Sequence, residues 1–295
     1  MTQIIVGVDD SERAVDAVAL AVTLARTAGA ELLIAHAYPS ETVPSRVSLP
    51  DWERRAFERA TVVMERHLDA ATGVPARVSP LPGGSPARQL HELAEREGAA
   101  AIVIGSSHRG DVGRVLAGTT AERLLHGAPC PVLVAPRGYG GGELQRILVG
   151  HDGGDEAQGA LEVALAAPGH VHLVRVLQPV SMSLQASMAG VWTPPSDLES
   201  EARKAFEAEF SDLGDAVERE FLVGDAVAEL VRCTRAADLA IVGSRGYGRL
   251  RSVLLGSVSA QLVREAACPV MVVPRGAAAE AIRLLGGNSA AAKAV

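Results

Sequence analysis

The sequence predicts an α/β fold that is built twice along the chain. Short apolar runs alternate with amphipathic stretches of helical period, which is the pattern of strand–helix–strand units in a parallel sheet. The apolar run that ends at Gly105 recurs before Gly243, and the run that follows Cys130 recurs after Cys268, in both cases 138 residues further on. A repeat of this length is too long for a solenoid unit, so each copy should have its own core. We therefore expect two tandem Rossmann-like domains, each a five-stranded parallel sheet flanked by helices.

In the first copy, apolar runs without strict alternation are typical of strands that are buried on both faces. They predict strands at residues 3–8, 31–37, 76–80, 100–105 and 131–136. Helical spacing of apolar residues predicts helices at 12–28, 51–71, 85–98 and 119–126. Gly29 supplies a C-terminal stop for the first helix, and Ser85 is the expected cap of the third, with Pro86 in its first turn.

The second copy repeats this order. Its predicted strands are residues 146–150, 170–176, 217–222, 241–243 and 269–274, and its predicted helices are 155–166, 198–212, 225–236 and 257–266. We expect a first domain at 1–138, a short glycine-rich linker at 139–143 and a second domain at 144–276. Residues 277–295 form an alanine-rich tail that is expected to fray, with 280–285 as a candidate helical turn.

Composition narrows the classes of function. The 295 residues carry a net charge of −7 and only 3% aromatic residues, whereas a protein that coats nucleic acid needs a basic surface and stacking platforms. No apolar run reaches the roughly 18–20 residues that span a bilayer, and the first residues lack the features of a signal peptide. The three cysteines have no metal-ligand spacing. The sequence favours a cytoplasmic protein with free thiols that binds neither nucleic acid nor membrane.

Two features converge on one edge of each predicted sheet. In an open parallel sheet, ligands bind outside the carboxyl ends of the strands, near the point where strand order reverses. Asp9 follows the first strand of one copy and Asp152 that of the other, while a glycine-containing loop joins Gly243 to a helix that begins at Ser257. Glycines let the backbone approach a phosphate, and the helix N-terminus presents unpaired N–H donors. This pattern predicts an anion-binding site.

Side chains of the same loop add to the predicted site. Ser257 and Ser259 offer hydroxyl donors, and three arginines could offset phosphate charge: Arg245, Arg249 and Arg251. Two simpler interpretations stay open, because the glycines could serve only a tight strand-to-helix connection and each Asp could cap the following helix. The loop lacks a Gly-Lys-Ser/Thr ending, so a P-loop of the common nucleotide-hydrolase type is absent.

The spacing Gly243-x2-Gly246-x9-Gly256-Ser257 resembles the nucleotide motif of the universal stress proteins, as do Asp152 and the closing strand after Cys268. The resemblance covers both copies, almost to residue 275. It implies ATP binding, with Asp152 at the ribose and adenine end and the backbone near Val176 beside the base. Four residues would wrap the phosphates and Ser259 would add a third phosphate contact: Gly243, Gly246, Gly256 and Ser257. Gly154 departs from the family, which usually has serine after the Asp.

The first copy departs further from the motif. It reads Gly105-Ser106-Ser107-His108, nine residues, and then Gly118-Thr119, so His108 stands where the second glycine is expected. Ala121 replaces the hydroxyl residue that corresponds to Ser259, although Asp9 retains the strand-end pattern. We therefore expect weaker or conditional binding at Asp9, Gly105, Gly118 and Thr119.

Other catalytic or metal sites have less support in the sequence. The histidines show no paired spacing with cysteine or carboxylates that would form a zinc site, and no Gly-x-Ser-x-Gly elbow of a serine hydrolase is present. Cys130 and Cys268 precede proline at the start of matching strands, where burial is expected rather than reactivity.

The closing strands predict how the copies assemble. Residues 132–134 and 270–273 are apolar runs at sheet edges, which need a partner or a cover. Because the equivalent strands pair two subunits in single-domain relatives, we expect the two copies to pair within one chain, and a homodimer of the whole chain is an additional expectation.

The leading hypothesis for function is an ATP-binding regulatory protein of the stress response, with Mg²⁺ as a candidate companion of the phosphates. Bound ATP would order the loops after the fourth strands and change a surface that an unknown regulatory protein partner recognises. No general base or metal-bridging set is recognisable beyond the strand-end aspartates, so slow hydrolysis is the most turnover we expect. An ATP-using enzyme of the wider adenine-nucleotide α-hydrolase-like group and a structural interaction module without nucleotide are the alternatives.

Overall fold

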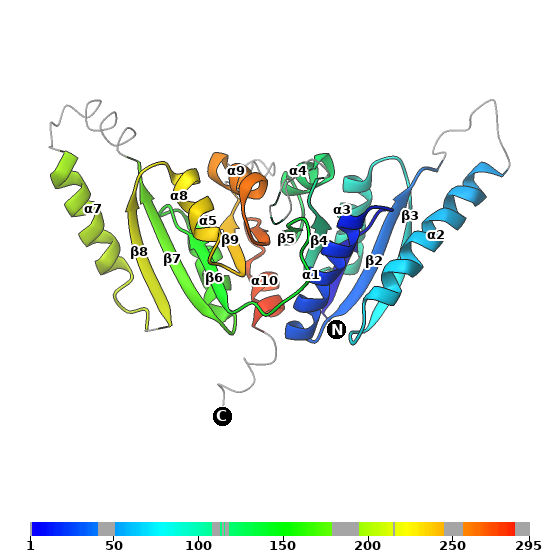
Figure 1. Ribbon diagram of the computed structural model, residues 1–295, viewed down its shortest axis with the longest axis horizontal. Coiled ribbons are helices and arrows are strands. Elements are labelled where there is room, and N and C mark those ends of the chain that lie inside the picture. Colours follow the sequence, from blue (N-terminus) through cyan, green and yellow to red (C-terminus); the bar gives the residue numbers. More distant parts are fainter. Residues whose placement is uncertain are drawn as a thin grey trace.

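The computed structural model describes residues 2–40, 51–107, 113, 115, 118–178, 195–214, 216–244 and 256–286. Within them the strands form one ten-stranded sheet, in the order β3-β2-β1-β4-β5-β10-β9-β6-β7-β8 (Figure 1). The first half of the chain contributes β1 (Gln3–Gly7), β2 (Glu31–Tyr38), β3 (Ala76–Pro82), β4 (Ala101–Gly105) and β5 (Val132–Ala135). The second half contributes β6 (Arg146–Gly150), β7 (His170–Leu177), β8 (Val217–Val223), β9 (Leu239–Gly243) and β10 (Val270–Val273).

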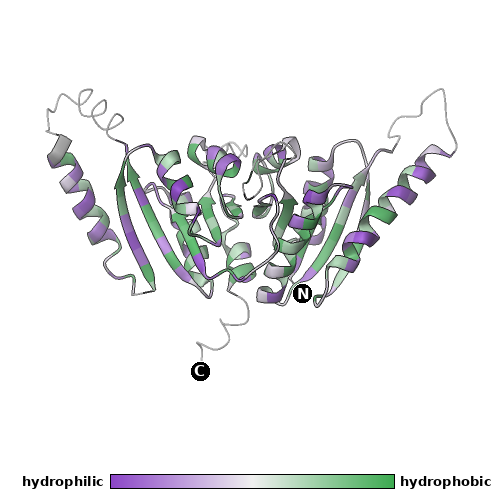
Figure 2. Cartoon of the chain, viewed as in Figure 1, coloured by the Kyte–Doolittle hydropathy of each residue, from purple (hydrophilic) through white to green (hydrophobic). Residues whose placement is uncertain are grey.

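Helices cover both faces of this sheet. One face packs against α1 (Glu12–Ala28), α2 (Trp52–Ala70), α5 (Asp155–Ala166), α7 (Pro195–Glu209) and α10 (Ala278–Leu285). The other face packs against α3 (Pro86–Glu97), α4 (Thr119–Leu125), α8 (Ala226–Thr234) and α9 (Ser257–Glu265). Figure 2 shows the apolar strands between these layers and the hydrophilic outer surfaces of α2 and α7. The predicted fold class is confirmed, and each half is a five-stranded parallel sheet flanked by helices.

Local sequence explains where the first helices begin and end. Gly29 adopts φ 59°, and its N–H donates to the Ala25 carbonyl, so the predicted stop is confirmed. Pro86 occupies the first turn of α3 and Ser85 its N-cap position, as expected, although the Ser85 side chain makes no capping hydrogen bond. Asp225 does cap α8, because its carboxylate accepts the Ala228 N–H at 2.9 Å.

The chain after Arg275 is more ordered than the sequence suggested. Residues 278–285 form α10, which packs against α5 and α1 and so joins the two halves. Ala281, Leu284 and Leu285 are buried and lie on one face, since they are spaced three and four residues apart. The candidate helical turn at 280–285 is confirmed, and the expectation of fraying is wrong for residues 278–285.

One antiparallel contact joins the two half-sheets. β5 and β10 pair with Leu133 opposite Met271, whereas every other strand pair in the described sheet is parallel. All residues of both strands are buried. The closing strands therefore pair within the chain, as the sequence predicted. The thiols that precede them, Cys130 and Cys268, are also buried, and burial raises the pKa of each to about 12.

The contact between Leu133 and Met271 is testable by a double-mutant cycle. Each alanine substitution should lower the free energy of unfolding by about 2–5 kcal/mol, because both side chains are fully buried. Since the two residues face each other across the pair, their effects should couple by roughly 0.5–3 kcal/mol in denaturant unfolding. As a control, Leu133→Ala and Val171→Ala should add to within about 0.5 kcal/mol, because β7 lies four strands away. Additive effects of Leu133→Ala and Met271→Ala would contradict the pairing.

Candidate functional site

The strand order creates a crevice in each half. β1 lies between β2 and β4, so the chain passes to one side of β1 and then crosses back to the other. β6 lies in the same way between β7 and β9. The loops that leave such neighbouring strands diverge to opposite faces of the sheet, which is where open α/β sheets bind ligands. The predicted aspartates follow β1 and β6, at this edge.

In the first half, a cavity of about 720 Å³ occupies this crevice. It is lined by the carboxyl ends of β1, β2 and β4 and by the first turns of α1, α3 and α4. The cavity brings together all four residues that the sequence predicted for this half: Asp9, Gly105, Gly118 and Thr119. Its volume lies within the range of small-molecule sites, about 300–1,000 Å³.

The loop that carries Asp9 is held in place from within the protein. The Asp9 carboxylate accepts the Ser11 backbone N–H at 3.1 Å and lies 3.5 Å from the Arg13 guanidinium. His36 Nδ1 lies 2.7 Å from the Val8 carbonyl oxygen, and His67 Nε2 lies 3.1 Å from that of Asp9. The Asp9 side chain nevertheless remains 55% exposed. The N-cap residue of α1 is Ser11, so Asp9 is not a simple helix cap; its carboxylate also accepts the Ser11 hydroxyl and lines the cavity.

The glycines that end β4 and β9 have a structural reason. A Cβ on Gly105 would lie 2.3 Å from the Arg13 carbonyl oxygen, and one on Gly243 would lie 2.4 Å from that of Glu156. No side chain fits where these strands pass the first turn of α1 and α5. Close packing of β4 against α1 and of β9 against α5 therefore accounts for these two glycines without a ligand. Gly118 differs, because a Cβ there would meet only the Ser107 side chain at 3.8 Å.

The N-terminus of α4 faces the first-half cavity. Gly118 has an extended backbone at the cap position, and no side chain caps the helix. Thr119 is exposed and lines the cavity. Glu122 in the first turn would repel an anion, but its carboxylate lies 2.7 Å from the Arg264 guanidinium. Arg264 belongs to α9 in the second half and lines the first-half cavity, so the two halves build this site together.

Two of these residues, Arg13 and Arg264, were not among the sequence candidates. Arg13 lies one turn after Asp9 and also donates to the Ser106 carbonyl at 3.4 Å. An arginine four residues after a strand-end Asp could therefore have been predicted from the sequence as a site residue. No comparable signal existed for Arg264, because its position depends on the pairing of the two halves.

In the second half, the predicted residues end neighbouring strands or begin α9. The Asp152 carboxylate accepts the Gly154 N–H at 3.0 Å and is exposed, and Gly154, not Asp152, caps α5. Val176 lies near the carboxyl end of β7. Gly256 caps α9 with an extended backbone, and Ser257 is exposed in its first turn.

Ser259 makes a hydrogen bond inside the protein. Its hydroxyl donates to the Gly243 carbonyl at 3.0 Å, and this hydrogen bond links the first turn of α9 to the end of β9. The remaining predicted loop residues lie outside the described residues: Gly246, Arg245, Arg249 and Arg251 in the second half, and His108 in the first.

The strand-end loop of the second half is held by a different network. His151 is buried, and its Nδ1 accepts the Gly153 N–H at 3.1 Å and an Arg175 N–H at 2.9 Å. Burial, and then the Arg175 charge, lower the pKa of His151, so the imidazole is neutral. Arg175 also binds the Glu209 carboxylate at 2.7 Å, and this hydrogen bond lowers the pKa of Glu209. The guanidinium lies 5.2 Å from the Phe206 ring centre.

A family model described as the universal stress protein family matches residues 1–136 and again residues 143–274. The chain belongs to the universal stress protein family. A universal stress protein of Thermus aquaticus, named for its place in the QAH/OAS sulfhydrylase 3' region, is 37% identical over 134 residues, which are 44% of this chain and 96% of the relative. One from Mycolicibacterium smegmatis is 28% identical over 228 residues, which are 75% of this chain and 76% of the relative.

A solved structure shares the tandem arrangement. The crystal structure of a universal stress protein from Archaeoglobus fulgidus DSM 4304 superposes with a TM-score of 0.69 at 22% identity, and the match covers 93% of this chain and 98% of that one. This likeness shows that the fold is shared. Among the residues that the structure describes, no helix has the length and apolar character needed to cross a bilayer.

The contrast between Gly105 and Gly118 is testable in this universal stress protein. Gly105→Ala should lower the free energy of unfolding by roughly 1–3 kcal/mol, because the new methyl group would overlap the Arg13 carbonyl. Gly118→Ala should change it by no more than about 0.5 kcal/mol. Denaturant unfolding of the two variants makes the comparison. Equal stability of the two variants would show that the β4–α1 crossing does not require glycine.

Proposed function

We propose that this chain is a nucleotide-binding regulatory protein of the stress response that holds ATP at the carboxyl edge of its sheet. The observation that supports this most directly is the 720 Å³ first-half cavity, which joins the exposed Asp9 carboxylate to the N-terminus of α4. A carboxylate at one end suits the hydroxyls of a ribose, and unpaired backbone N–H groups at the other suit phosphates. In this proposal Asp9 holds the sugar, and Gly118 and Thr119 hold the phosphates.

The second half is proposed to bind more tightly. It retains the glycine spacing Gly243, Gly246 and Gly256 with Ser257, whereas the first half has His108 at the second position. Asp152 takes the role of Asp9, and the β7 backbone near Val176 lies beside the base. Ser259 holds the Gly243 carbonyl, so its hydroxyl would have to turn from that oxygen to donate to a phosphate.

The charged side chains at the proposed phosphate end of the first-half cavity favour nucleotide binding over rapid ATP hydrolysis. Glu122 lies in the first turn of α4 together with Thr119, and its carboxylate is paired with Arg264 at 2.7 Å. Asp9 is placed at the proposed sugar end. Mg²⁺ would therefore be held mainly by the phosphates and water, as this ion commonly is.

Regulation would follow if bound ATP changed the surface at the carboxyl ends of β4 and β9. ATP can shift the protein toward one state only if it binds that state more tightly, and a partner protein would recognise the difference. The partner, a homodimer of the whole chain and a cytoplasmic location are parts of this proposal.

Calorimetric titration with ATP tests the proposal. Wild-type protein should bind two equivalents with unequal affinity. Asp152→Ala should weaken the tighter site about tenfold or more, because a hydrogen bond to a charged group contributes roughly 1.5–3 kcal/mol. Asp9→Ala should weaken the other site by a similar factor.

Asp69→Ala, on the exposed side of α2, is the matched control and should bind like wild type. Absence of saturable binding by wild type would refute the nucleotide proposal. Loss of the tighter site in Asp9→Ala instead of Asp152→Ala would reverse the ranking of the two halves.

A further inference from the structure

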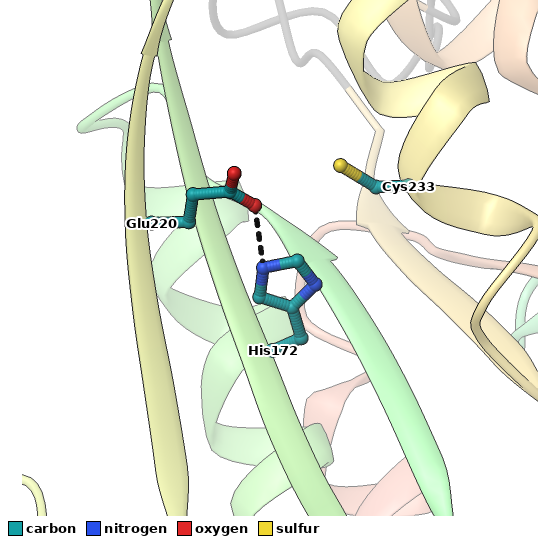
Figure 3. Close-up of side chains that lie close together, drawn as sticks. All are labelled: His172, Glu220 and Cys233. Carbon is teal, nitrogen blue, oxygen red and sulfur yellow. Dashed lines mark hydrogen bonds and ion pairs between the residues drawn. The ribbon is translucent and has the colours of Figure 1, made fainter.

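Three potential metal ligands converge on one face of the second half, away from the carboxyl edge. His172 lies on β7, Glu220 on β8 and Cys233 on α8 (Figure 3). One ligand atom from each, the imidazole nitrogen, a carboxylate oxygen and Sγ, lies within 4.8 Å of the other two. His172 Nε2 and Glu220 Oε2 are 2.8 Å apart, and the Cys233 sulfur points toward them. The sequence showed no paired spacing of histidine with cysteine or carboxylates, because the three residues come from separate elements.

The register of the sheet explains why these side chains meet. His172 pairs with Leu148 on one side and with Glu218 on the other, and Leu148 belongs to the core beneath α8. Residues two apart on a strand share a face, so Glu220 lies diagonally across from His172. Cys233 lies in the last turn of α8 and is 5% exposed. Because α8 covers this face of the sheet, the Cys233 thiol lies over His172 and Glu220.

The first half places apolar residues where the second half has its histidine and cysteine. Gly7 and Gly150 both end the first strand of their half, and the pairing beside them aligns Leu33 with His172. Gly84 and Gly224 both precede the helix that follows, which aligns Leu93 with Cys233. Leu33 and Leu93 are fully buried. The fold therefore accepts apolar residues at these two positions, whereas the second half places a partly exposed histidine and a buried thiol there.

The geometry points to a divalent transition-metal site, and we propose that His172, Glu220 and Cys233 bind Zn²⁺. Zinc takes sulfur at about 2.3 Å and nitrogen or oxygen at about 2.0–2.2 Å, so tetrahedral ligand atoms lie roughly 3.3–3.8 Å apart. Starting from 4.8 Å or less, the three ligands reach these separations with movements of about 1 Å. A mixed nitrogen, sulfur and oxygen set suits zinc, whereas Mg²⁺ and Ca²⁺ prefer oxygen alone.

A cavity provides access and room for a fourth ligand. Its volume is about 350 Å³, and His172 and Cys233 line it together with His170 and Glu218. With three protein ligands, zinc would keep one position for water or a small anionic ligand from this cavity. The Glu220 carboxylate also lies 3.9 Å from the Arg232 guanidinium, and this ion pair orients it.

The thiol would lose its proton when zinc binds. Burial raises the pKa of Cys233, and the charge of Arg232 opposes this effect, while Glu220, Glu229 and Glu218 add to it. Zinc binds cysteine as the thiolate, so the thiol proton would be released to solvent as the Zn–S bond forms. No oxidant or reductant is involved.

Titration with Co²⁺ and Zn²⁺, in the absence of nucleotide, tests the site. Co²⁺ should bind the full-length protein with one equivalent that shows the near-ultraviolet thiolate-to-cobalt charge-transfer band, and Zn²⁺ should displace it. Cys233→Ser should remove that band. His172→Leu installs the first-half residue and should weaken Zn²⁺ binding at least tenfold, as measured by competition with a chromophoric chelator. Glu220→Gln should also weaken it.

Two variants keep the outcome interpretable. Cys268→Ser changes a buried thiol that precedes β10 and does not belong to the proposed zinc site. This variant should retain the full charge-transfer band. The double variant His172→Leu/Cys233→Leu restores the residues of the first half and should fold with wild-type circular dichroism while losing the metal. The proposal is wrong if wild type gives no thiolate band, if the band survives in Cys233→Ser, or if His172→Leu binds Zn²⁺ as tightly as wild type. ATP titrations are independent of all of these results.

Discussion

The antiparallel pairing of β5 with β10 is the contact on which the rest of the structure depends. Each strand is four residues long, fully buried and apolar, and would be an exposed edge if its half stood alone. Pairing them turns two half-sheets into one and brings α9 beside α4. From this follow the ion pair between Arg264 and Glu122 and the hydrogen bond from the Val115 N–H to the Ala266 carbonyl at 2.8 Å. α10 strengthens the same junction on the opposite face, where it packs against α1 and α5.

The two halves share their core but differ in the polar groups around it. Where Val8 follows β1, His151 follows β6 and accepts two hydrogen bonds through Nδ1. His36 at the end of β2 corresponds to Arg175 on β7, which binds Glu209 and stacks near Phe206. Parallel strands buried on both faces tolerate little change inside, so sequence differences concentrate at strand ends and at the outer strands. These differences in polar side chains would allow the two halves, which share one fold, to bind nucleotide with unequal affinity and to hold a separate metal site.

Much of the fold could be predicted from the sequence because its signals are local. Continuous apolar runs gave the strands, and Gly29 gave a helix end that needs a positive φ. The pairing of the closing strands was predicted from their apolar edges and from the resemblance to single-domain universal stress proteins. Ser85 does occupy the predicted cap position, but its residue type did not reveal that its hydroxyl makes no capping hydrogen bond. α10 was underestimated, since an alanine-rich segment is stabilised here by packing of Leu284 and Leu285 and not by its own length.

The site was harder to predict because its parts meet only through tertiary register. Asp9, Gly118 and Thr119 do line one cavity, but Gly105 is glycine because of the Arg13 backbone, a reason that no motif spacing reveals. Arg264 and the group of His172, Glu220 and Cys233 join residues from distant segments. The spacing of residues along the chain does not predict contacts of this kind between side chains of distant segments.

The central claim, that backbone amides at the carboxyl edge hold a nucleotide, is tested most directly by hydrogen–deuterium exchange with and without ATP. The account predicts slower exchange in ATP at residues 105–107 and 118–122 and at the corresponding residues 243–244 and 256–259. Exchange should stay unchanged near His172 and Glu220, toward the other end of the strands. Saturating ATP that left the amides at these strand and helix ends unprotected, or that protected only segments elsewhere, would contradict the account.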